Sequence, residues 1–63
     1  MTAKQTMKWF EELFPYLKSD VVSYKANKED GGIDISMVND MGNESVFNFK
    51  FETRTNWTLK RVR

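Results

Sequence analysis

The sequence contains no cysteine and no histidine, and it has only one proline and three glycines among its 63 residues. Without cysteine the chain can form no disulfide and no thiolate metal site. Without histidine it lacks the commonest metal ligand and the usual general base at neutral pH, so Ser-His-Asp catalysis is excluded. No apolar run reaches the ~18 residues of a membrane helix or the ~7–15 of a signal peptide. We therefore expect a cytoplasmic protein that does not enter a membrane.

The composition is that of one small folded domain. Two Trp, two Tyr and five Phe supply the apolar mass, and each such ring can bury on the order of 150–250 Å². A chain near this length buries only roughly 60% of its unfolded surface. We expect a single domain over residues 1–63 with a stability on the order of 3–5 kcal/mol, present as a monomer or a homodimer.

The first third of the chain has the period of an α-helix. Thr2 with Gln5 three residues later matches a capping box, although Thr6 is an alternative N-cap. Pro15 should interrupt the helix because it removes a backbone hydrogen bond and clashes with the preceding turn. We expect a kink or break there, followed by a short turn from Pro15 to Lys18. The apolar residues that form one helical face at spacings of three and four are Met7, Phe10, Leu13, Phe14 and Leu17.

Beyond Asp20 the apolar period changes to two, which is typical of half-buried strands. The stretches 27–32, 39–44 and 54–56 that separate the runs are rich in turn-forming residues and too short for parallel crossovers. The sequence therefore predicts an α+β, two-layer domain, with one N-terminal helix packed on a four-stranded antiparallel β-meander. The alternating apolar sets are Val22, Tyr24 and Ala26; Ile33, Ile35 and Met37; Phe47, Phe49 and Phe51; and Trp57 with Leu59.

The opposite face of the predicted sheet is polar and of mixed charge, and we expect it to face water. It would carry Ser23, Lys25, Asp34, Ser36, Val38, Asn48, Lys50, Glu52, Thr58 and Lys60. No grouping of these or other residues resembles an active site. Glu11 and Glu12 are adjacent and point about 100° apart on a helix, and the acidic stretch 27–44 fails the calcium-loop pattern around each glycine. We expect no enzyme activity, no metal and no cofactor.

Charge is distributed unevenly along the chain. Residues 26–46 hold one lysine against five carboxylates, a net charge of −4, whereas residues 51–63 hold four cations against one carboxylate, a net charge of +3. A basic strand beside aromatic rings can bind nucleic acid through phosphate contacts and base stacking. The overall charge of +1 is low for such a protein, so nucleic-acid binding is the alternative hypothesis. Its residues would be Lys50, Arg54, Trp57, Lys60, Arg61 and Arg63.

Some large apolar residues have no evident place in the core. Trp9 and Tyr16 lie beside the helical apolar stripe, and Met41 lies in a polar turn. Trp, Tyr and Met are enriched at protein interfaces, although Trp9 could instead cover the sheet edge and Met41 could fold over the core. Our main hypothesis is a small non-enzymatic binding or regulatory protein that acts through a protein partner. Its size and composition are compatible with small inhibitors encoded by phages or plasmids, a likeness that transfers no residues.

Overall fold

The helix begins with the capping box that the sequence predicts. In the computed structural model, which describes residues 1–63, helix α1 spans Ala3–Leu13. The amide of Gln5 donates to Oγ1 of Thr2 at 3.2 Å, and the amide of Thr2 donates to Oε1 of Gln5 at 2.9 Å. These two bonds satisfy backbone donors that no helical carbonyl can reach. Thr6 is not the cap, since it lies inside the first turn and donates its hydroxyl to the carbonyl of Thr2.

Pro15 ends the α-helix, as its missing backbone donor requires. The residue before it, Phe14, leaves helical geometry with φ −129° and ψ 63°. The chain then continues as the 3₁₀ helix η1, Pro15–Asp20. The predicted turn from Pro15 to Lys18 is therefore correct in kind and two residues short.

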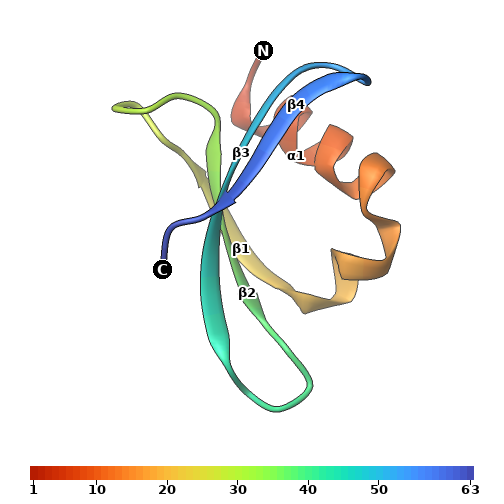
Figure 1. Ribbon diagram of the computed structural model, residues 1–63, viewed down its shortest axis with the longest axis vertical. Coiled ribbons are helices and arrows are strands. Elements are labelled where there is room, and N and C mark those ends of the chain that lie inside the picture. Colours follow the sequence, from red (N-terminus) through yellow and green to blue (C-terminus); the bar gives the residue numbers. More distant parts are fainter.

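Four strands follow in the predicted order. They are β1 (Val21–Ala26), β2 (Ile33–Val38), β3 (Glu44–Thr53) and β4 (Asn56–Arg61), and each pairs with the next in an antiparallel ladder. The helix covers one face of this sheet, which confirms the two-layer α+β fold (Figure 1). Strands β1 and β4 are the two edges of the sheet.

The core lies between α1 and the two central strands. The ring of Phe10 from α1 is fully buried and meets Phe49 of β3 edge-on, with centroids 5.4 Å apart. Phe47 and Phe51 are partly buried and pack against the same cluster, so the three phenylalanines of β3 belong to the core. The buried apolar residues are Met7, Phe10, Ile33, Ile35, Met37 and Phe49.

The first strand differs from the prediction at its start. The alternating pattern placed Val22 on the apolar face, but the register shifts between Val21 and Ser23 and makes a bulge. Val21 takes the position opposite Met37 and is partly buried, while Val22 is 66% exposed. The doublet of valines allows this exchange, since either can occupy the inward position.

Asn48 also differs from the prediction, which placed it in water. It is only 7% exposed, because the β1–β2 turn closes over it from the face opposite the helix. Its Nδ2 donates to the carbonyl of Gly31 at 3.1 Å and to Oδ1 of Asp34 at 3.0 Å. A buried amide of this kind is stable only because its donors have partners.

Candidate functional site

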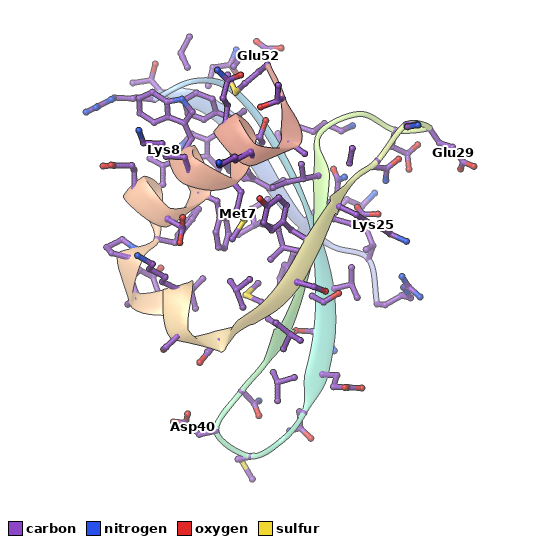
Figure 2. The ribbon with its side chains drawn as sticks, turned by 180° about the vertical axis from the view of Figure 1, so that it is seen from behind. Met7, Lys8, Lys25, Glu29, Asp40 and Glu52 are labelled. Carbon is purple, nitrogen blue, oxygen red and sulfur yellow. The ribbon has the colours of Figure 1, made fainter.

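A groove runs between α1 and the edge strand β1, with a volume of about 790 Å³. Helix α1 contacts β1 as well as β2 and β3, but it leaves Val22 and Tyr24 of β1 exposed. Figure 2 shows this space from the β1 side, with Met7 between the helix and the strand. We call it the edge groove. Its floor is apolar and consists of Met7, Val21, Val22 and Tyr24, and its rim is charged and consists of Lys4, Lys8, Glu11 and Lys18.

The floor of the edge groove exposes apolar surface that the fold does not cover. Met7 is buried and Val21 is half-buried, but Val22 is 66% exposed and Tyr24 is 40% exposed. Tyr24 stands opposite the fully buried Ile35 of β2, so its side chain is on the helix side of the sheet. It lines the groove together with Lys4 and Met7 of α1 and is still partly exposed. Neighbouring apolar side chains in a surface groove are a common feature of binding sites.

The rim of the edge groove is positively charged. Three lysines, Lys4, Lys8 and Lys18, face one carboxylate, that of Glu11. Nζ of Lys18 lies 3.8 Å from Oε2 of Glu11, and this is the only ion pair in the molecule. An exposed pair at that distance contributes little to stability. Lys4 and Lys8 have no carboxylate partner, so the rim keeps a net positive charge.

The backbone of β1 adds hydrogen-bonding groups to this surface. The amide of Asn27, just after the strand, donates to the carbonyl of Gly32 at 3.0 Å. Backbone groups alternate in direction along a strand, so Lys25 turns its amide and carbonyl toward β2. Tyr24 and Ala26 then present theirs to the free edge. Such unpaired groups can form a ladder with another strand.

A polar cluster at the other end of β1 fastens the strand to the sheet. Nδ2 of Asn27 donates to both carboxylate oxygens of Asp34 at 3.2 Å, and Asn48 donates to Oδ1 of the same residue. The hydrogen bond from Asn48 is the largest influence on the pKa of Asp34 and lowers it. Partial burial raises the pKa, and the hydrogen bond from Asn27 lowers it further. Asp34 therefore stabilises the β1–β2 hairpin in its ionised form.

The residues predicted to bind a protein occupy three separate elements. Trp9 on α1 is half-buried: its ring stacks on Phe51 at 4.8 Å, and the guanidinium of Arg54 lies 5.0 Å from the ring centroid. It thus covers the sheet near the β3–β4 turn. Tyr16 on η1 is 72% exposed, and Met41 in the β2–β3 turn is 86% exposed. The idea that Met41 folds over the core is wrong.

These three residues do not form one surface. The turn that holds Met41 and its neighbour Asp40 lies at the opposite end of the molecule from Lys8 on α1 (Figure 2). The structure instead brings together Val22, Tyr24 and the helix lysines, which sequence reasoning did not select. One signal was present in the sequence, namely the Val21-Val22 doublet that breaks the period of two.

The residues predicted to bind nucleic acid are divided between the two faces of the sheet. Lys50 and Lys60 project from the face opposite the helix, since their neighbours Phe49 and Leu59 pair on the helix side. Arg54 lies over Trp9, and the ring of Trp57 is half-buried against Phe14 at 5.1 Å. Arg61 donates from Nε to the carbonyl of Arg63 at 3.1 Å. Only part of the set can therefore face one ligand.

Neither a metal-binding cluster nor a membrane-spanning helix is found in the structure. The structure contains no group of three or more Asp, Glu, His or Cys side chains arranged to hold a metal ion. None of its helices has the length and apolar character needed to cross a membrane. Comparison with protein-family models, with curated proteins and with solved structures finds no match to this chain.

Proposed function

We propose that this protein is a non-enzymatic binding module that acts on a protein partner as a small regulator or inhibitor. The observation that carries the proposal is the edge groove, where a free strand edge, exposed apolar side chains and uncompensated lysines lie side by side. These are the three kinds of contact that a protein ligand uses. The partner docks along β1.

Strand addition at a sheet edge explains how so small a protein can bind a larger one. Main-chain hydrogen bonds supply affinity, and alternate side chains supply specificity. Tyr24 offers a large, rigid contact of the type enriched at binding hot spots, and Val22 beside it extends the apolar area. Neither residue is needed by the core, since both are exposed.

Nucleic-acid binding stays the second candidate because three of its predicted residues share the open face of the sheet. Lys50 and Lys60 project there, and Arg63 lies beside Asp34 and Ser36 on the same face. Phosphate contacts from such a face would make affinity fall steeply with salt. The aromatic rings that would stack on bases are on the other face, which favours the protein partner.

The test is affinity capture from a lysate of the source organism with matched variants. Wild type, Val22→Asp, Tyr24→Lys and Met41→Ala would each be immobilised after circular dichroism has shown that they are folded. We expect wild type and Met41→Ala to retain the same partner and the two groove variants to lose it. Retention of that partner by both groove variants would move the site elsewhere. Capture that nuclease treatment abolishes would favour nucleic acid.

A further inference from the structure

The chemistry of the edge groove indicates what kind of segment fits it. We infer that it takes an extended, acidic segment of a partner protein, in which apolar residues alternate with carboxylates, and that this segment pairs with β1 as a fifth strand. The inference rests on the proposed function and adds the chemical class of the ligand. Three features of the groove support it, namely the free backbone groups of β1, the apolar floor and the charged rim.

The backbone sets the conformation and the length of the segment. The bulge between Val21 and Ser23 interrupts regular pairing at the start of β1. The regular part that follows ends at Ala26, and within it Tyr24 and Ala26 present their backbone groups outward. A ligand that pairs with them must be extended, and about four to six residues are enough to reach both groups at ~3.3 Å per residue.

The two faces of β1 set the side-chain pattern of the segment. On the helix side the added strand would lie beside Tyr24 and Val22, which are exposed and apolar. On the opposite side it would lie beside Lys25, the only charged residue of β1. Because successive side chains of a strand point to opposite faces, apolar residues and carboxylates must alternate.

The rim selects negative charge independently of that pattern. Lys4 and Lys8 have no carboxylate within ion-pair distance, and Lys18 shares only the exposed contact with Glu11. Carboxylates at the ends of the segment could reach these exposed lysines across the apolar floor. Charge complementarity of this kind also speeds association and excludes basic partners.

A second copy of this chain fits the groove less well. Its β1 brings another Lys25 and no carboxylate, and its own groove brings the same unpaired lysines. A charged residue on an edge strand and a bulge are two devices by which proteins prevent self-pairing of edges. The charges therefore favour a different protein as the partner.

The test uses three blocked seven-residue peptides in which valine alternates with glutamate, glutamine or lysine. Each would be titrated into ¹⁵N-labelled protein while amide shifts and hydrogen exchange are followed. We expect the glutamate peptide to shift the amides of Val22, Tyr24 and Ala26, to slow exchange at Tyr24 and Ala26, and to bind at least about tenfold more tightly than the lysine peptide.

A charge swap tests whether the rim lysines, rather than the overall charge of the protein, select the peptide. The double variant Lys4→Glu/Lys8→Glu should reduce the preference for the glutamate peptide, with Lys25 still attracting it, whereas Lys28→Glu, a turn residue outside the groove, should leave the preference unchanged. Both lysines are exposed, so the helix should tolerate the swap, and an acidic residue at position 4 is favourable in the first turn of the helix.

The outcomes distinguish this inference from the proposed function. Equal binding of the three peptides at β1 would overturn the acidic preference and leave a protein-binding edge in place. Absence of shifts at β1 with every peptide would overturn strand addition, and the partner captured from lysate would then decide the function by itself. A dimer by sedimentation whose β1 amides are protected without peptide would show a second copy as the occupant.

Discussion

The two edges of the sheet have the same length and the same position in the topology, yet they are covered differently. On β4 the helix-side residues Trp57 and Leu59 are half-buried, and the ring of Phe14 packs edge-on against Trp57. On β1 the helix-side residue Tyr24 is exposed and borders a groove. The difference arises at Pro15, which ends α1 with Phe14 directed toward β4. One edge is thereby completed by the fold and the other is left available.

The two edges are also held in different ways. Aromatic contacts between the helix and the sheet hold β4, whereas β1 depends on its ladder with β2 and on the hydrogen bonds among Asn27, Asp34 and Asn48. Val21 at the start of β1 also packs against the core cluster that includes Met7 and Phe10 of the helix, so only the later part of the open edge depends on the sheet alone. A partner can bind there without displacing any part of the core.

The largest effect is expected at the turn that fastens β1. Gly32 has φ +70°, and a Cβ added to it would lie only 2.3 Å from the carbonyl oxygen of Phe49. Gly32→Ala should cost about 3 kcal/mol or more, since left-handed strain and a backbone clash each cost ~1–3 kcal/mol. Urea denaturation followed by tryptophan fluorescence would measure it.

Gly31→Ala is the matched control for that substitution. Gly31 is also left-handed, with φ +84°, but an added Cβ meets nothing within 4 Å. Gly31→Ala should lower the free energy of unfolding by ~1 kcal/mol, which is the cost of the left-handed backbone conformation alone. Equal losses of unfolding free energy in the two variants would show that the close approach of Gly32 to β3 does not make its substitution more costly.

The second prediction compares how much the side chains at the two edges contribute to stability. Phe14→Ala should cost about 2 kcal/mol, less than for a fully buried phenylalanine, because the ring is only half-buried. Tyr24→Ala on the open edge should stay within about 0.5 kcal/mol, as for other surface substitutions. Thermal unfolding of both variants beside wild type tests this, and a comparable loss at Tyr24 would mean that β1 is structurally covered after all.

The third prediction concerns pH and the polar cluster. The pKa of Asp34 lies below its usual value of 3.8 in the folded protein. Its carboxylate therefore contributes stability above that pH, and the contribution is lost as the pH falls through the folded pKa. Urea midpoints measured between about pH 6 and pH 3 should fall more steeply for wild type than for Asp34→Asn.

Asn48 provides a second measurement of the same cluster. Because its amide is the main cause of the lowered pKa, Asn48→Ala should raise the pKa of Asp34 toward its usual value. Carboxyl ¹³C NMR titration would report this directly. An unchanged pKa in a folded Asn48→Ala variant would contradict the assigned cause.

The smallest effect is expected for nucleic acid at the basic end of the chain. Titration with mixed DNA and RNA oligonucleotides should shift few amides near Lys50, Lys60 and Arg63, and these shifts should vanish at about 0.15 M salt. Arg61→Glu should then change little. Strong shifts across residues 47–63 that persist at that salt concentration, and that Arg61→Glu removes, would instead support the second candidate function.

Much of the fold could be predicted from the sequence because its signals are local. The capping box at Thr2, the break at Pro15 and the alternation of Phe47, Phe49 and Phe51 each depend on neighbouring residues. The bulge at Val22 and the burial of Asn48 could not be predicted in the same way. They depend on which valine faces Met37 and on how the β1–β2 turn closes over β3.

The helix, the four strands and their antiparallel order follow from local features of the sequence, because periodicity and turn residues act over short distances. The position of the helix on the sheet, in contrast, depends on contacts between distant parts of the chain. That placement follows from the packing of Trp9, Phe10 and Phe14 against β3 and β4, contacts between residues more than 35 positions apart. Phe14 at the end of the helix packs on Trp57 of β4, whereas no aromatic contact of this kind reaches Tyr24 of β1, which stays exposed.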